Sequence, residues 1–395
     1  MKHFDYIICG GGMSGLSLAY YLVNSKINNK RILIIEPQDK NQNDRTWAFW
    51  DKGSNPFEEI VYRKWDSVNF YNTKGQKQHL DIGEYTYKVI RGIDFYKFII
   101  PQLNKSNSVT WLKDSVEKIE DKGSFASVKT KNGKTFKADY IFDSTYKLKL
   151  NLPQNYNVLQ HFKGIVIKTE EPCFNSEIPD MMNFGVEQKN DECRFIYILP
   201  FDEKTALIEY TLFSESLLTQ EEYDAELNDY IVNNLKLTNH TILEEEFGVI
   251  PMTDEATEEF PSKRIVRIGT AGGTTNPATG YTFNGTQKRL QEIVLQLEKT
   301  GNPALKSNWW QRRHLLYASV LLNVIVKKRY PIGDVFSQMY TKNKPEVMFS
   351  FLDGDSNFFQ ELKLMASTPI QHFGLAALQT IGRNFRRLLF KARPF

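Results

Sequence analysis

Three glycines near the start of the chain have the spacing of a phosphate-binding turn. Gly10, Gly12 and Gly15 follow the apolar run 4–9 and lead into a segment, 14–23, with apolar residues at helical spacing. Such a turn brings the backbone close to a pyrophosphate, which the positive N-terminus of the following helix attracts. The pattern predicts a dinucleotide-binding site, and the alternative is a glycine-rich loop without a ligand.

An acidic residue stands where the second half of such a site needs one. Glu36 ends the apolar strand 31–36, about 20 residues beyond the glycine turn, where its carboxylate would accept a hydrogen bond from a ribose hydroxyl. The strand, the turn, the helix and the acidic residue together favour a ligand site over a structural loop.

A second glycine-rich turn lies far along the chain, at 269–281, directly after the short apolar strand 264–268. A helix is predicted to begin near Thr282. Its N-terminal amides would stabilise negative charge on a bound cofactor, as a reduced flavin requires.

The elements between the two turns are those of a flavoprotein with a two-dinucleotide fold. They are an Arg-bearing turn into a helix at 87–100, a pair of strands at 109–119 and a hairpin before strand 138–144, which returns to a parallel sheet. The hairpin is expected to turn at Asn132 and Gly133 with two positive backbone φ angles. This order of elements favours FAD over a freely exchanging nicotinamide.

One carboxylate is out of place in a strand of the middle region. Glu209 interrupts the apolar strand 205–213, and the surrounding segment 158–247 is rich in strands. It lies either at a wet sheet edge or in a buried cavity, where desolvation would favour its protonated form. In the second case Glu209 would be an acid.

Composition narrows the class of protein. The chain has 395 residues and a net charge of +3, which is too small and too dispersed to indicate a nucleic-acid partner. The cysteines Cys9, Cys173 and Cys193 lack metal-ligand spacing, so we expect neither a metal nor a disulfide. The N-terminus does not read as a signal peptide, and a cytoplasmic protein is expected.

Two apolar segments bear on membranes. The run 315–326 is too short to span a bilayer and is predicted to be a buried or interfacial helix. The C-terminal segment 381–395 mixes basic and bulky apolar residues without acidic ones, which is typical of a helix on a membrane surface. A solvated terminal helix with one apolar stripe on the core is the alternative.

The whole chain resembles the bacterial lycopene β-cyclases. Many of these enzymes have a second acidic residue where this chain has Tyr210, and flavin monooxygenases place an Asp where it has Thr270. The most discriminating blocks are 199–211 and 269–281. The other blocks that carry the resemblance are the opening turn with Glu36, Arg45–Phe49, Arg91–Phe95 and Gln160–Gly164.

The resemblance implies an activity and its cofactors. The family converts the linear ends of lycopene, or of another linear carotenoid, into β-rings without net redox change, using reduced FAD and NAD(P)H as reductant. It also implies that Glu209 is the catalytic acid. Because the substrate is a water-insoluble hydrocarbon, we expect peripheral contact with the inner face of a membrane.

Two other functions are compatible with the same nucleotide-binding elements. A monooxygenase or reductase acting on an isoprenoid would consume reduced nicotinamide with its substrate. A non-catalytic carotenoid-binding flavoprotein would leave the carotenoid unchanged.

The expected fold is α/β: an FAD-binding, flavin monooxygenase-like fold with an inserted β-rich substrate domain and a C-terminal helical part. The expected ranges are 1–155 and 248–300 for FAD binding, 156–247 for the substrate domain and 301–395 for the helical, membrane-facing part. The residues expected to bind the cofactor are Gly10, Gly12, Met13, Ser14, Gly15, Glu36, Arg45, Thr46, Arg91, Asp143, Gly269, Gly272, Pro277, Gly280 and Tyr281.

Overall fold

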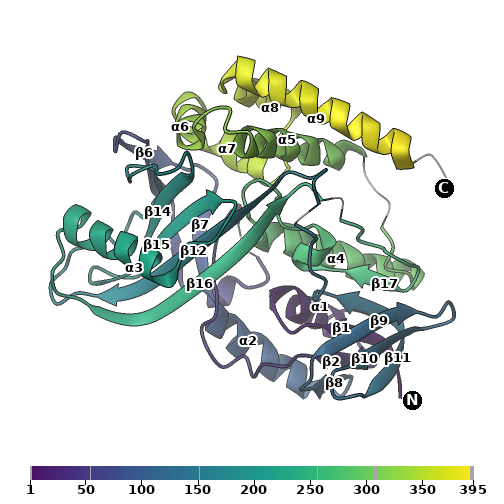
Figure 1. Ribbon diagram of the computed structural model, residues 1–395. Helices are drawn as coiled ribbons and strands as arrows, with labels where there is room; N and C mark the ends of the chain where they lie inside the picture. Colours follow the sequence, from purple (N-terminus) through teal and green to yellow (C-terminus); the bar gives the residue numbers. More distant parts are fainter. Residues whose placement is uncertain (1, 54, 151, 256, 306–308, 392–395) are drawn as a thin grey trace.

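The computed structural model describes residues 2–53, 55–150, 152–255, 257–305 and 309–391, with side chains for all of these except 309–312 and 387–391. A parallel sheet with its helices lies at one end of the molecule, a larger sheet crosses the middle, and the C-terminal helices cover the other end (Figure 1). The fold is the α/β arrangement expected from the sequence.

The first sheet begins with the expected strand, turn and helix. Its strands run in the order β8, β2, β1, β11, β10, β9, with β17 also beside β11. Strands β8, β2, β1, β11 and β17 are parallel, whereas β9 and β10 are antiparallel to their neighbours. The bounds are β1 (His3–Cys9), β2 (Ile32–Ile35), β8 (Val109–Leu112), β9 (Val116–Asp121), β10 (Ala126–Thr130), β11 (Thr135–Asp143) and β17 (Ile265–Arg267).

Both faces of this sheet are covered, which explains the continuous apolar run of β1. Tyr6 and Ile8 pack towards the helices α1 (Met13–Val23), α2 (Gly92–Lys105) and α4 (Phe283–Thr300). Ile7 and Cys9 pack on the opposite face against residues of β10 and β11. Packing on both faces therefore fixes the position of β1 and of the glycine turn that follows it.

The turn between β10 and β11 differs from the expectation. Thr130 N donates to Lys134 O at 2.9 Å, so the loop has three residues rather than two. Gly133 has a φ of +79°, whereas Asn132 is not among the residues with positive φ. The prediction of two positive φ angles is wrong, because a three-residue hairpin loop needs the left-handed conformation only at its last position.

The second sheet forms the middle of the molecule, in the order β16, β12, β15, β14, β13, β5, β6. Only β13 and β5 pair in parallel among these described strands. The bounds are β5 (Ser67–Tyr71), β6 (Lys77–Asp81), β12 (Asn157–Lys168), β13 (Asp180–Asn183), β14 (Cys193–Pro200), β15 (Thr205–Ser214) and β16 (Thr241–Thr253).

The alternation of side chains along β15 divides its residues between the two faces of this sheet. Ile208 and Tyr210 pack against α3 (Gln220–Asp229), while Leu207 and Phe213 face the core shared with the C-terminal helices. Glu209 has the parity of the second set, so it points away from α3. A small antiparallel sheet connects the two large ones and consists of β3 (Thr46–Asp51), β7 (Thr86–Arg91) and β4 (Arg63–Trp65).

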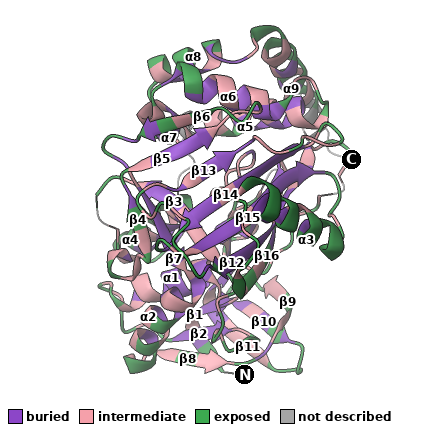
Figure 2. Ribbon diagram, turned by 90° about the vertical axis from the view of Figure 1, so that its left-hand side faces the viewer, coloured by how far each residue is buried: buried purple, intermediate pink, exposed green. Residues whose placement is uncertain are grey.

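The C-terminal helices pack on the second sheet (Figure 2). Leu322 and Val324 of the run 315–326 are fully buried, whereas Leu315 is exposed. Among the described residues no helix combines the length and apolar character needed to cross a bilayer. The bounds are α5 (Trp309–Val326), α6 (Ile332–Lys342), α7 (Pro345–Leu352), α8 (Phe358–Ala366) and α9 (Ile370–Lys391).

The expected domain ranges remain a prediction. The second sheet takes β5 and β6 from the range 1–155, and β16 crosses residue 247. The C-terminal segment 381–391 is the end of α9, and residues 392–395 lie outside the described part of the chain.

Candidate functional site

The first glycine turn has the geometry of a phosphate cradle. Gly10 has a φ of +97°, and a Cβ there would lie 2.2 Å from Ser144 Oγ. A Cβ on Gly15 would lie 2.0 Å from Gly10 O, so α1 approaches β1 as closely as only glycine allows. By contrast, a Cβ on Gly12 would meet nothing within 4 Å, which leaves open space beside the first amides of α1.

Glu36 lies at this turn, as expected from the sequence. Gly11 N donates to Glu36 Oε2 at 2.6 Å, and Gln38 N donates to Oε1 at 3.0 Å. The carboxylate therefore stands at the carboxyl ends of β1 and β2, where dinucleotides bind in this class of sheet.

The second glycine turn meets the first. Gly269 has a φ of +64°, and a Cβ there would lie 2.2 Å from Ser14 Oγ at the start of α1. A Cβ on Gly272 would lie 2.3 Å from Arg267 O. Two turns that are more than 250 residues apart in the sequence thus form one surface at the carboxyl edge of the first sheet.

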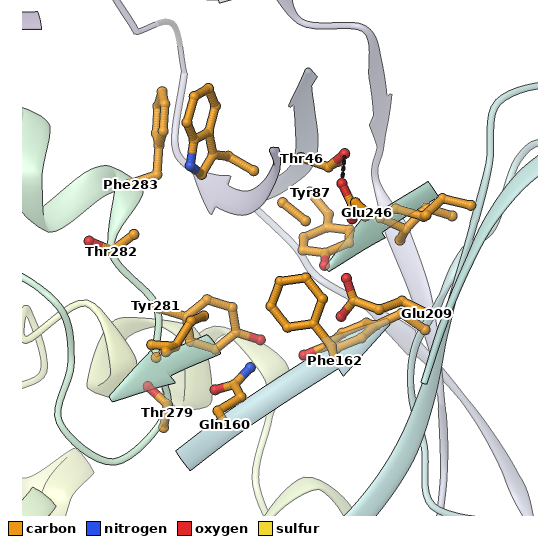
Figure 3. A pocket seen from close by; sticks show the side chains of 17 residues that line it. Thr46, Tyr87, Gln160, Phe162, Glu209, Glu246, Thr279, Tyr281, Thr282 and Phe283 are labelled. Carbon is orange, nitrogen blue, oxygen red and sulfur yellow. Dashed lines mark hydrogen bonds between the residues drawn. The ribbon is translucent and has the colours of Figure 1, made fainter. Parts of the chain in front are cut away.

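A cavity lies between this edge and the second sheet (Figure 3). Its walls come from β3, β7, β12, β14, β15, β16 and the start of α4. The lining is mostly apolar and aromatic, with two carboxylates. The lining residues are Thr46, Trp47, Ala48, Tyr87, Gln160, Phe162, Tyr197, Leu199, Leu207, Glu209, Glu246, Ile250 and Thr279–Phe283.

Glu209 faces this cavity from a central strand, because β15 lies between β12 and β14. The wet-edge alternative is therefore excluded. Thr211 Oγ1 donates to Glu209 Oε1 at 2.7 Å. Burial, followed by the nearby charge of Glu246, raises the pKa of Glu209 well above its usual value. This shift favours the protonated form of the Glu209 carboxyl, which is the form that can act as an acid.

The aromatic side chains opposite Glu209 stay uncharged. Tyr87, Tyr197 and Tyr281 approach the carboxyl from three different elements, and burial raises the pKa of Tyr281 to about 12. Burial places the pKa of Tyr87 and of Tyr197 well above the usual value too. Neutral aromatic faces around an acid can stabilise a transient cation.

Buried polar atoms without partners mark where a ligand would bind. Gln160 Oε1 and Thr279 Oγ1 are buried and accept or donate no hydrogen bond within the described part of the chain. Both residues line the cavity beside Gly280, whose φ is +73°. Since buried polar groups are nearly always paired in proteins, these two atoms fit the polar edge of a flat cofactor.

Other predicted site residues lie around this cavity with partners of their own. Thr46 lines it and donates to Glu246 Oε2 at 2.7 Å. Arg45 donates to Phe247 O at 3.2 Å, while Arg91 forms a bidentate ion pair with Asp94.

The remaining predicted residues shape the turns. Asp143 ends β11 and accepts from the Thr145 hydroxyl at 2.6 Å. Met13 is buried at the start of α1. Pro277 lies in a loop that the hydrogen bond from Asn276 N to Tyr281 O closes at 2.8 Å.

Glu246 is a site residue that the sequence reasoning missed. Its carboxyl lines the same cavity, and burial raises its pKa to about 7, although the Thr46 hydroxyl acts in the opposite direction. One signal was available: Glu246 belongs to an acidic run, 244–246, inside a long strand. Only the strand register shows that Glu246 points towards Glu209 while Glu245 points to the other face, where it pairs with Lys163 at 3.3 Å.

Solved structures resemble this fold at low sequence identity. A flavoprotein/dehydrogenase from Cytophaga hutchinsonii has a TM-score of 0.64 at 13% identity, over 96% of this chain and 100% of that one. A geranylgeranyl bacteriochlorophyll reductase-like protein from Thermoplasma acidophilum has a TM-score of 0.60 at 13% identity, over 94% and 98%. The flavin-dependent brominase Bmp2 has a TM-score of 0.59 at 13% identity, over 89% and 94%.

These three proteins have different descriptions, and at 13% identity the similarity shows only a shared fold. A comparison with curated proteins finds no match. The model of the family described as lycopene cyclase protein matches residues 5–378, which is nearly the whole chain. The chain therefore belongs to the lycopene cyclase family.

Proposed function

We propose that this protein is a lycopene β-cyclase, which closes the linear ends of lycopene into the β-rings of γ-carotene and β-carotene. One observation carries the proposal: Glu209, a carboxyl with a raised pKa, faces an apolar and aromatic cavity at the edge of a dinucleotide-binding fold. Protonating an alkene needs such an acid in a site without water.

The cofactor in this proposal is FAD. The open space at Gly12 beside the N-terminus of α1 would hold the pyrophosphate, with Glu36 at the ribose. Gln160 and Thr279 would meet the polar edge of the isoalloxazine at the second turn. When bound and reduced by NAD(P)H, FAD supplies negative charge that stabilises a cation.

The residues of the chain carry the remaining steps. Glu209 gives its proton to the terminal double bond of the substrate and leaves a tertiary carbocation on the neighbouring carbon. The rings of Tyr87, Tyr197 and Phe162 lie in the cavity and stabilise this cation until an internal double bond attacks it. Loss of a ring proton completes the β-ring, so protons and electrons balance without a net redox change.

The experiment is anaerobic incubation of the protein with FAD, NADPH and lycopene in liposomes, followed by separation of the carotenoids. A cyclic product without matching loss of NADPH supports the cyclase, and the numbers of mono- and bicyclic molecules show whether one or both ends close. The variant Glu209→Gln is expected to bind FAD and yield no product. Loss of NADPH in proportion to substrate would instead favour a reductase or monooxygenase.

We also propose that the C-terminal helices dock on a lipid bilayer, since the substrate is held there. Large apolar side chains are exposed on α8 and α9, at the end of the molecule opposite the parallel sheet (Figure 1). Phe359 is 80% exposed and Leu378 is 73% exposed. The sequence of α9 contains no acidic residue and ends in basic ones, which suits an anionic membrane surface.

A further inference from the structure

Gly164 lies between two glutamates, one on each of the two strands that pair with its own strand. In the register of the second sheet, Gly164 of β12 is paired with Glu209 of β15 on one side and with Glu246 of β16 on the other. Residues directly opposite one another across strands project from the same face. Both carboxyl groups therefore point into the cavity (Figure 3). The residue between them in the strand register, Gly164, has no side chain.

The absence of a side chain at Gly164 leaves room for the side chain of Glu246. A Cβ on Gly164 would lie 3.0 Å from Glu246 Cγ and 3.0 Å from Leu207 Cδ1. In this arrangement the two carboxyls line one cavity, and burial, followed by the charge of Glu246, raises the pKa of Glu209. Two carboxyls in this position can hydrogen-bond to each other only when one of them holds a proton.

The other partners of the pair are neutral hydroxyls. Thr211 donates to Glu209 at 2.7 Å and Thr46 donates to Glu246 at 2.7 Å. Within the described residues no lysine, arginine or histidine lies within 4.0 Å of either carboxyl. Without a counter-ion, two adjacent half-buried carboxylates repel each other, so a single shared proton stabilises the pair.

Charged and titratable groups of the surrounding elements act on the pair from farther away. The positive charge of Arg45 favours the ionised form of Glu246, and the negative charge of Glu244 opposes it. Tyr87, Tyr197 and Tyr281 face Glu209 as neutral groups. These charges favour placing the proton of the pair on Glu209 and the negative charge on Glu246.

We propose that Glu246 is a second catalytic carboxyl, which accepts the proton lost from the new ring; this inference rests on the proposed function. Glu209 breaks its O–H bond to form the C–H bond of the substrate, and the cavity then holds two carboxylates beside the cation. The ring C–H bond breaks, its electrons form the ring double bond, and the proton passes to Glu246. Return of the proton from Glu246 to Glu209 restores the starting state.

The first experiment measures cyclisation by FAD-loaded variants. Glu246→Gln keeps the acceptor for Thr46 but cannot take a proton, and the rate constant kcat is expected to fall by about 100-fold or more. Glu246→Asp keeps a carboxylate and is expected to recover at least about one tenth of the wild-type rate. Glu245→Gln is the matched control, because it removes a neighbouring charge from the opposite face of the same strand. Wild-type kcat in Glu246→Gln would overturn the proposal.

The second experiment does not depend on activity. The infrared band of the protonated carboxyl of Glu209 is assigned in the FAD-loaded protein from the difference between wild type and Glu209→Gln, and is titrated with pH. Removing the negative neighbour in Glu246→Gln is expected to move the titration to lower pH, while Glu245→Gln leaves it in place. An unchanged titration refutes the shared proton. A shift in a protein that forms no cyclic carotenoid refutes the cyclase and keeps the pair.

Discussion

The carboxyl of Glu246 should make the stability of the protein depend on pH in a definite direction. Burial raises its pKa from 4.5 to about 7 in the folded state. The folded protein thus holds this proton more tightly than the unfolded chain does. The resulting stabilisation is complete below pH 4.5 and is lost as the pH rises through 7.

The magnitude follows from the size of this interval. At about 1.4 kcal/mol for each pH unit, the wild type loses about 3 kcal/mol of unfolding free energy between pH 4.5 and 8 because of Glu246. Glutamine at this position has no proton to lose. Glu246→Gln should therefore gain about 3 kcal/mol relative to wild type over the same interval.

The assay is urea unfolding of the full chain followed by circular dichroism at a series of pH values. Asp353, whose pKa burial also raises to about 7, contributes equally to both proteins, so the difference between the two curves reports Glu246 together with its effect on Glu209. Glu245→Gln, on the exposed face, should follow the wild type. Parallel curves for wild type and Glu246→Gln would show that the Glu246 carboxyl is solvated, and would contradict its pairing with Glu209.

Three further predictions concern other parts of the molecule. Gly15→Ala places a Cβ 2.0 Å from the backbone oxygen of Gly10, so FAD affinity, measured by flavin fluorescence, should fall at least about tenfold. The free energy of unfolding should fall by about 1–3 kcal/mol. Unaltered FAD affinity would contradict the phosphate-binding role of this turn. In Gly164→Ala the added Cβ contacts only flexible side chains, at 3.0 Å, so the fold should persist. Displacement of Glu246 should lower kcat by about tenfold or more. Full activity would argue against two carboxyls that lie close together at this position. The double variant Phe359→Ser, Leu378→Ser should reduce sedimentation with anionic liposomes several-fold without changing cyclisation in detergent, and unchanged sedimentation would exclude this face from docking.

Structural features that depend only on residues close together in the sequence could be predicted. The glycine turn needs only its own backbone and a strand buried on both faces, and both are visible in residues 4–23. The unusual position of Glu209 in an apolar strand was also visible, but its burial depended on the strands on either side. The strand order supplies that information, and it excludes the edge alternative.

The parts that depend on register could not be predicted. Glu246 becomes a neighbour of Glu209 only because both strands pair with Gly164, and pairing between distant strands leaves no local pattern. The three-residue loop ending at Gly133 has a more local cause: the bond between Thr130 and Lys134 sets the loop length, and the Asn-Gly pair alone does not reveal it.

The interleaving of the two sheets has a consequence for synthesis on the ribosome. Asn69 of β5 pairs beside Asp180 of β13, so the β5–β6 hairpin emerges about 10 s before its partner at a translation rate of roughly 10 residues per second. Strand β11 is likewise synthesised long before β17, the strand with which it pairs. During that interval the nascent chain carries unpaired strand edges, which are aggregation-prone. Slowing translation between these strands should therefore lengthen the time for which chaperones bind the nascent chain.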